Sequence, residues 1–122
     1  MRIIAATLAV AAVALTFAVA EGAGGRSGTV TLTGVVGPGF TISLKNRTKT
    51  VKTLAPATYT FAISDKSNLH NFHLTGPGVN RKTTVGGMGT TRWTLTLRKG
   101  TYRYVCDPHA SIMNGSFIVQ AP

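Results

Sequence analysis

One stretch near the C-terminal end holds the side chains best suited to chemistry. It reads YVCDPHASIMNGSF and runs from Tyr104 to Phe117. Cys106 is the only cysteine in the sequence, His109 follows three residues later, and Met113 follows four residues after that. A thiolate, an imidazole and a thioether at this spacing fit a metal site, and the first two also fit a nucleophile with its base. An ordinary turn is the third interpretation.

Strand parity predicts that the cysteine points inward. Tyr102, Tyr104 and Cys106 alternate along one face of a strand that ends at Pro108, because side chains two residues apart share a face. The thiol is therefore expected at the rim of a core. The imidazole of His109 lies in the turn that follows, close enough to meet the same atom as the thiolate. The thioether of Met113 can approach that atom from the far side.

A metal site of this kind needs a second imidazole, and the upstream segment NLHNFHL offers two candidates. His70 and His73 have opposite parity in an extended segment. His70 shares its parity with Phe72 and Leu74, so it is predicted to face the core. His73 is predicted to face solvent.

Three chemistries compete for these side chains. One thiolate, two imidazoles and a thioether form the soft, mixed donor set that suits copper as it cycles between Cu(I) and Cu(II). Zinc accepts cysteine and histidine, but a thioether is a poor zinc ligand and structural zinc sites usually hold more cysteines. A catalytic Cys-His pair needs an orienting third group. Asp107 does not supply it, since its side chain is expected to leave the strand on the face opposite Cys106.

Short strands are expected to position these residues. Each is rich in β-branched or aromatic residues and is bounded by turn residues. About seven such strands in about one hundred residues predict an all-β fold, a Greek-key β-sandwich. The expected strands are Thr29 to Thr33, Phe40 to Lys45, Thr58 to Ser64, Leu69 to Leu74, Thr90 to Leu97, Thr101 to Cys106, and Ser116 to Val119.

The first twenty residues have the pattern of a secretory signal peptide. Arg2 precedes an apolar run that closes in Ala18-Val19-Ala20, so cleavage is expected after Ala20. A retained membrane anchor is the alternative, because the run approaches spanning length. Residues 21–28 are rich in glycine and are expected to form a flexible lead-in, and residues 29–122 to form one domain. The domain is therefore expected outside the cytoplasm, in a periplasm, at the cell surface or in the extracellular medium.

The mature protein is strongly basic. Glu21, Asp65 and Asp107 are the only acids in the chain, against thirteen Lys and Arg, of which only Arg2 lies in the signal segment. Such a surface favours acidic partner proteins or weak association with anionic membrane surfaces. No nucleic-acid partner is expected, because the basic residues are dispersed and no nucleic-acid motif or basic helix accompanies them. An unpaired cysteine in an exported protein also needs a reason, and metal ligation supplies one.

The segments that carry these donors resemble the cupredoxins, small type 1 blue copper proteins such as plastocyanin, pseudoazurin and amicyanin. The resemblance rests on the glycine-led strand from Gly100 to Cys106, the Cys-x-x-His step with a proline inside it, the following methionine, and a last strand that begins near Gly115. It extends upstream to the His70-Asn71 pair and to the strand from Leu54 to Phe61. Most of residues 29–122 are covered.

The resemblance implies one copper ion held by named residues. His70, Cys106 and His109 correspond to the equatorial ligands and Met113 to the weak axial ligand. The loop from Cys106 to Met113 is one residue shorter than in plastocyanin and one longer than in amicyanin, so a methionine that only fills the core is the alternative at that position. Asn71 is expected to support the ligand sulfur through its backbone N–H. Alternatively, its side chain, which strand parity directs outward, connects the two ligand loops.

The function that this resemblance implies is one-electron transfer between redox partner proteins by an exported, monomeric copper protein. Electrons are expected to pass at the edge of His109, through an apolar patch that includes Ala110 and Ile112. Copper storage or delivery without electron transfer is the alternative. It is disfavoured because only Met88 and Met113 remain as methionines once the signal segment is removed.

Enzymatic activity is not expected. Copper oxidases with a trinuclear cluster carry histidines on both sides of the cysteine, whereas Val105 and Asp107 occupy those positions here. The chain has three histidines in total, too few to hold additional copper ions beside the first.

Overall fold

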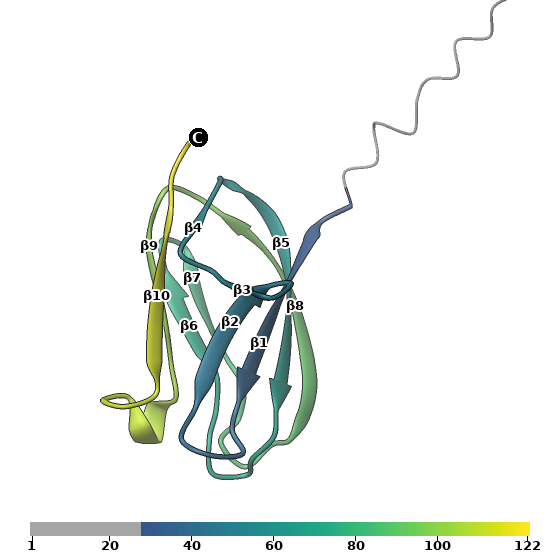
Figure 1. The fold of residues 1–122 in the computed structure, drawn as a ribbon, viewed down its shortest axis with the longest axis vertical. Helices are drawn as coiled ribbons and strands as arrows, with labels where there is room; N and C mark the ends of the chain where they lie inside the picture. The colour runs from purple at the N-terminus through teal and green to yellow at the C-terminus, as the bar shows by residue number, and fades with distance from the viewer. Residues whose placement is uncertain (1–27) are drawn as a thin grey trace, which may run out of the picture.

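Two β-sheets of five strands each pack face to face (Figure 1). This is seen in a computed structural model, which describes residues 28–122. The predicted signal peptide over residues 1–20 and the lead-in over residues 21–28, apart from Gly28, lie outside the described residues. The strands are β1 (Val30–Val36), β2 (Ile42–Asn46), β3 (Lys49–Thr50), β4 (Thr53–Leu54), β5 (Ala57–Asp65), β6 (His73–Gly76), β7 (Val79–Lys82), β8 (Gly89–Leu97), β9 (Gly100–Val105) and β10 (Asn114–Val119).

The order of the strands shows that the chain crosses repeatedly between the sheets. One sheet has the order β3-β2-β1-β5-β8 and the other the order β4-β10-β9-β6-β7. Most pairs are antiparallel, but β1 pairs with β5 and β10 with β4 in parallel. The expected all-β Greek-key sandwich is confirmed. The short strands β3, β4 and β7 are additions to the seven that the sequence predicts.

Alternating residues build the core between the sheets. Along β8, Trp93 and Leu97 are buried whereas Arg92, Thr94 and Thr96 are exposed, because successive side chains of a strand point to opposite faces. The buried aromatic side chains form two stacked pairs, Phe72 with Tyr104 and Tyr102 with Phe117. Among the described residues, no helix has the length and apolar character needed to cross a membrane.

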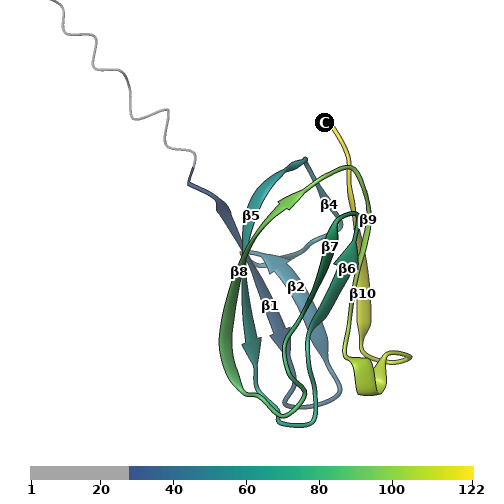
Figure 2. The ribbon, with the colours of Figure 1, turned by 180° about the vertical axis from the view of Figure 1, so that it is seen from behind.

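The loops that carry the candidate donors meet at one end of the sandwich. The β1–β2 loop, the β5–β6 loop and the short 3-10 turn η2 (Asp107–His109) lie at the end opposite the C terminus (Figure 1; Figure 2). Each of them follows a long strand of the core, so the rigid sheets determine where the three connections are held.

The strand predicted over Leu69 to Leu74 is wrong for residues 69–72, because β6 begins only at His73. The preceding backbone does not pair with β9. The N–H of Phe72 instead donates to the Thr83 hydroxyl at 2.9 Å, and the side chain of Asn71 donates to the Thr83 carbonyl at 3.2 Å. These side-chain contacts, together with one backbone hydrogen bond from the Thr83 N–H to the Phe72 carbonyl at 3.0 Å, replace the ladder with β9 and leave the residues around His70 in a loop.

Candidate metal centre

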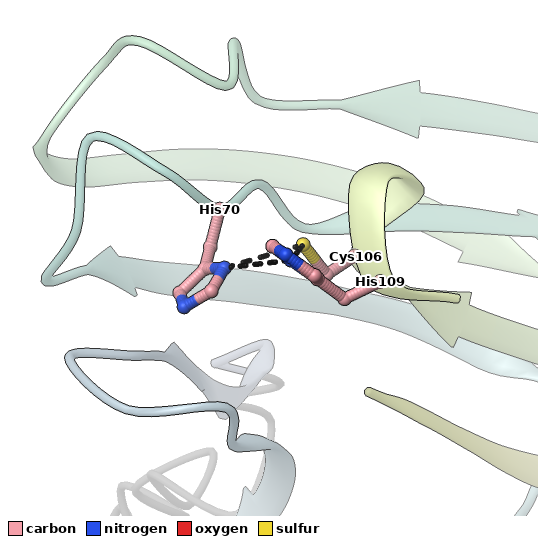
Figure 3. Close-up of side chains that lie close together, drawn as sticks. All are labelled: His70, Cys106 and His109. Carbon is pink, nitrogen blue, oxygen red and sulfur yellow. Dashed lines mark hydrogen bonds between the residues drawn. The ribbon is translucent and has the colours of Figure 1, made fainter. Parts of the chain in front are cut away.

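The β5–β6 loop begins with a turn that its own polar side chains stabilise. The Asp65 carboxylate accepts a hydrogen bond from the Ser67 N–H at 3.0 Å, and the Ser67 hydroxyl accepts one from the Leu69 N–H at 3.1 Å. Burial raises the pKa of Asp65, although the Ser67 hydrogen bond and the charge of His70 act in the opposite direction. This turn directs the imidazole of His70 toward the second ligand loop (Figure 3).

The β9–β10 loop is closed by its own backbone. Pro108 lies at the start of η2, where its restricted φ suits a helical turn. The His109 N–H donates to the Cys106 carbonyl at 3.0 Å, and the Met113 N–H donates to the His109 carbonyl at 2.8 Å. The Cys106 N–H then donates to the Met113 carbonyl at 3.0 Å. Cys106, His109 and Met113 are thereby held on one tight turn.

Three donor atoms from the two loops converge on one point. The Nδ1 atoms of His70 and His109 are 3.1 Å apart, and the Cys106 Sγ lies 3.7 Å from the first and 3.6 Å from the second (Figure 3). The circle through three atoms at these separations has a radius of about 2 Å, which matches metal–nitrogen bonds of about 2.0–2.1 Å and approaches metal–sulfur bonds of about 2.3 Å. The donors therefore fit one metal ion at their centre.

The surroundings of these donors favour a cation. Cys106 is fully buried and His70 is 2% exposed, so water has little access to either. The two Nδ1 atoms face one another, and the Cys106 sulfur lies close to both. A single proton can join two of these three atoms, but it leaves the third without a partner. A shared metal ion satisfies all three donors at once. One thiolate with two imidazoles in a trigonal arrangement is the set typical of a single copper ion rather than of a structural zinc.

Met113 is fully buried at the same turn. Its backbone contacts with Cys106 and His109 keep it beside both donors. Its place in the core is established, while its role as axial ligand stays a prediction from the sequence.

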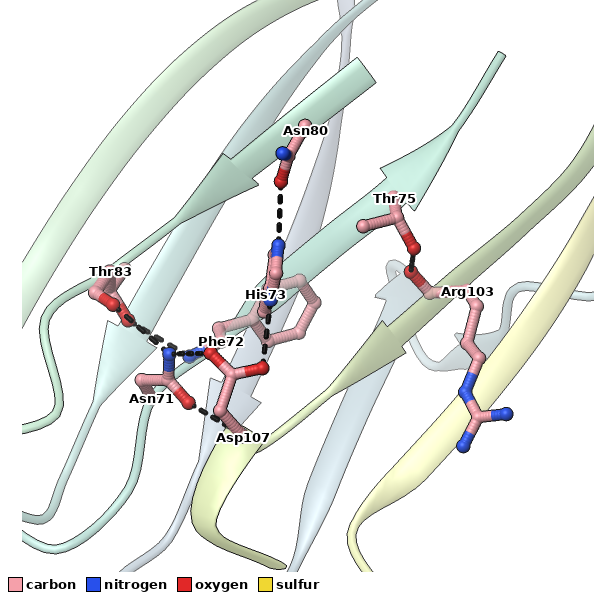
Figure 4. A network of polar contacts seen from close by, with 8 residues as sticks. All are labelled: Asn71, Phe72, His73, Thr75, Asn80, Thr83, Arg103 and Asp107. Carbon is pink, nitrogen blue, oxygen red and sulfur yellow. Dashed lines mark hydrogen bonds and ion pairs between the residues drawn. The ribbon is translucent and has the colours of Figure 1, made fainter. Parts of the chain in front are cut away.

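Asn71 and Asp107 connect the two ligand loops (Figure 4). The Asn71 amide nitrogen donates to the Asp107 carboxylate at 2.8 Å, and the Asp107 backbone N–H donates back to the Asn71 amide oxygen at 2.8 Å. Asn71 is 1% exposed, so the outward direction that strand parity suggests is wrong. The expected connection between the loops is confirmed. Because these residues directly follow His70 and Cys106, the pair of bonds determines how the two donors lie relative to each other.

Two neighbouring residues complete the site, and the sequence does not single them out. The Phe40 ring lies edge-on to both imidazoles, with centroids 5.4 Å from His70 and 4.9 Å from His109. Gly37, in the same loop, has φ +73°, and a Cβ at that position would lie 3.0 Å from Ser67 Cβ and 3.3 Å from His70 Cδ2. The Gly37-Pro38-Gly39 turn signal before an aromatic residue was the only available indication.

Apolar side chains surround the half-buried His109. Ile112 is 63% exposed and Ala110 is half-buried, so both of the residues expected in an apolar patch reach the surface. The Phe40 ring, which contacts both imidazoles, and Leu69, which precedes His70 in the chain, add further exposed apolar surface.

His73 is separate from this group. The sequence predicts that it faces solvent, whereas its side chain is only 19% exposed and lies outside the cluster of His70, Cys106 and His109.

Comparisons with known proteins agree with the geometry. Residues 43–120 match the family model of copper binding proteins of the plastocyanin/azurin family. A search of curated proteins found no significant match. Reduced rusticyanin is similar in structure, at 25% identity and a TM-score of 0.56 over 75% of this chain and 79% of that one. Rusticyanin from Thiobacillus ferrooxidans has 27% identity and a TM-score of 0.54 over 75% and 77% of the two chains.

Proposed function

The chain belongs to the plastocyanin/azurin family of copper binding proteins, and on that premise we propose that it is an exported carrier of single electrons with one type 1 copper ion. The observation that supports this most is the approach of the His70, Cys106 and His109 donor atoms to one point. We propose these three residues as the equatorial ligands and Met113 as the weak axial ligand.

When bound, copper supplies a one-electron couple between Cu(I) and Cu(II). The chain's own residues make electron transfer through that couple fast. Cys106 and His109 are held by the backbone bonds of one turn, and His70 is held by the Asn71–Asp107 bonds, so the donors keep their places whichever oxidation state is present. Buried donors beside Phe40 also exclude water, which would otherwise rearrange with each change of charge.

We propose that electrons enter and leave at the exposed edge of His109. His109 is the least buried of the three donors, and the apolar side chains of Ile112, Ala110 and Phe40 surround it. A partner can approach a patch of this kind closely without having to desolvate charged groups.

We propose that the redox partners of this protein are acidic proteins. The excess of Lys and Arg over acids would steer a negatively charged surface toward the protein, and salt would weaken that steering. We therefore expect the rate of electron exchange with an acidic partner to fall as ionic strength rises. A rate independent of salt contradicts this part of the proposal. We further propose that the protein is a monomer outside the cytoplasm, with weak association to anionic membranes at most and without enzymatic activity of its own.

Copper storage or delivery is the second candidate function. A storage protein offers ligands that exchange easily, often several exposed methionines. Here the exposed thioether belongs to Met88 alone among the described methionines, because Met113 is fully buried. The buried donor set favours electron transfer over delivery.

The test is to add Cu(II) to the purified protein without its predicted signal peptide and to record the absorption spectrum. We expect an intense thiolate-to-copper band that a mild reductant bleaches and an oxidant restores. Cys106→Ser should abolish the band. A colourless protein that binds zinc stoichiometrically contradicts the proposal, and a copper protein whose colour cannot be cycled favours storage.

The axial ligand is tested by a matched pair of methionine variants. Met113→Leu should keep the band but alter its spectrum and the reduction potential, because the axial bond tunes the site without being required for binding. Met88→Leu is the control, since its side chain is 66% exposed, and it should leave both measurements unchanged. Equal spectra for all three proteins would remove Met113 from the ligand set.

A further inference from the structure

His73 is held between two oxygen atoms next to the metal centre (Figure 4). It is the first residue of β6 and lies opposite Val105 of β9, the residue before Cys106. Its Nδ1 is 2.8 Å from the Asp107 carboxylate, and its Nε2 is 2.6 Å from the amide oxygen of Asn80 on β7. Both ring nitrogens thus face acceptors.

This geometry favours a doubly protonated ring. With the Asn80 amide oxygen turned toward Nε2, both neighbours are acceptors, so each ring nitrogen donates, and only the imidazolium carries a proton on both. Burial lowers the pKa of His73, but the hydrogen bonds to Asp107 and Asn80 and the charge of Asp107 outweigh burial and the nearby charge of Lys82, so that the pKa is raised. The contact with Asp107 is the only ion pair that residues 28–122 form.

We propose that His73 is a positioning residue of the metal centre, whose imidazolium holds the Asp107 carboxylate in place and offsets its negative charge beside the Cys106 thiolate. This inference rests on the proposed function, because it assigns His73 a role toward the copper ion of that site. His73 touches neither the donor atoms nor the ion, and it acts through Asp107 alone.

The first part of the role is geometric. Asp107 uses one carboxylate oxygen for His73 and the other for Asn71, while its backbone N–H holds the other end of the Asn71 amide. A carboxylate that is anchored on both oxygens cannot turn away from Asn71. The contact with His73 therefore helps to keep the loops of His70 and Cys106 at a constant separation.

The second part is electrostatic. Asp107 directly follows the thiolate ligand, so an uncompensated carboxylate there would stabilise the more positive, oxidised ion and lower the reduction potential. The imidazolium of His73 removes most of this effect, since the paired charges sum to zero. Because Asp107 is 41% exposed, solvent screens the pair, and its contribution to folding stability is small.

The test compares the reduction potentials of copper-loaded variants by voltammetry. His73→Gln should lower the potential, because it leaves the carboxylate uncompensated. Asp107→Asn in the His73→Gln background should reverse most of that decrease, because no charge remains to be compensated. Arg103→Gln is the control, since it removes one exposed positive charge from β9 without any contact to Asp107, and its shift should be much smaller. A His73→Gln potential equal to wild type, or a decrease that Asp107→Asn fails to reverse, overturns the inference.

A second measurement uses the metal-free protein and does not depend on copper. Nitrogen-15 NMR should show two protonated ring nitrogens for His73, and a neutral ring with one bare nitrogen contradicts the assigned contacts. Asn80→Ala serves as the second variant should His73→Gln fold poorly, and it should lower the potential by a smaller amount. If the wild-type protein gives no blue band, the proposed function fails. A blue band with unchanged potentials among the variants rejects only the role of His73.

Discussion

The two loops that supply the donors are held in different ways. The β9–β10 loop forms its hydrogen bonds within itself, from Cys106 through His109 to Met113. The β5–β6 loop depends on its surroundings, because Asn71 and Phe72 bond to Thr83 and Asn71 also bonds to Asp107 of the other loop. One loop is therefore determined by local sequence and the other by distant partners.

The difference shows where the site is vulnerable. Changes within η2 act on contacts that reform locally, so the loop can adjust as a unit. Changes at Asn71, or at residues that only touch the β5–β6 loop, should displace His70 relative to the other two donors. Substitutions outside the metal site then become informative about the site itself.

Copper binding should hold the β5–β6 loop and the β9–β10 loop through one shared ion, and its effect on stability is the largest that we expect. One ion shared by His70 and Cys106 links them directly. At free copper of about a thousand times the dissociation constant, the free energy of unfolding should rise by about 4 kcal/mol. Denaturant unfolding with and without copper measures this. His70→Gln should lose most of the gain, whereas His73→Gln should retain it. Equal gains in both variants would contradict a link through His70.

Asn71→Leu tests the dependence of the β5–β6 loop on side-chain contacts. The substitution leaves the Asp107 N–H and the Thr83 carbonyl without their partner, so the metal-free protein should lose about 1–3 kcal/mol of unfolding free energy. Asn68→Leu is the matched control in the same loop, because Asn68 is exposed, and its change should stay within about 0.5 kcal/mol. Similar losses in both variants would mean that the loop is not held by Asn71.

Gly37→Ala tests whether a neighbouring loop positions His70. A side chain here meets both a positive φ and the close contact with Ser67 and His70, so we expect a loss of about 1–2 kcal/mol. Gly39→Ala is the control, since no atom lies within 4 Å of its added Cβ, and it should leave stability unchanged or raise it by under about 1 kcal/mol. A blue band in Gly37→Ala identical to wild type would show that His70 tolerates the displacement.

The smallest effect is the pH dependence of the contact between His73 and Asp107. Burial raises the pKa of Asp107, but hydrogen bonds from Asn71 and His73 and the charges of His73 and Lys82 bring it below its ordinary value of 3.8. The Asp107 contribution is thus present above that value and is lost as pH falls through the folded pKa. The pKa of His73 is raised above 6.5, so its contribution is present below 6.5 and is lost as pH rises through the folded pKa.

Between these limits the pair should contribute under about 1 kcal/mol, because Asp107 is 41% exposed. The unfolding free energies of wild type and His73→Gln should therefore differ at about pH 5 and converge at about pH 9. A difference that grows with pH has the wrong sign for this contact.

Several features of the site follow from the sequence alone. Tyr102, Tyr104 and Cys106 are all buried, as strand parity predicts. The spacing from Cys106 to His109 is local, so the turn between them needs no information from the remainder of the chain. His70 faces inward as expected, although the strand invoked for it begins only at His73.

Other features depend on residues that the sequence places far apart. Nothing in the spacing of Phe40 relates it to the two imidazoles, because the β1–β2 loop reaches them only when the sheets pack. Asp107, which contacts both Asn71 and His73, is also more than thirty residues away from them, and the pairing of β6 with β9 brings it close. Parity describes only an extended strand, and it failed for Asn71 because that residue lies in a loop.

From its residue types and short-range periodicity, the sequence by itself determined the β-sandwich, the inward cysteine and the turn that carries His109. These depend on interactions between residues close in the chain, which backbone geometry and side-chain alternation control. The tertiary structure alone decided that His70 meets the other two donors and that Asp107 lies between Asn71 and His73. Those contacts join segments separated by more than thirty residues, and the pairing of β6 with β9 inside one sheet brings these segments together.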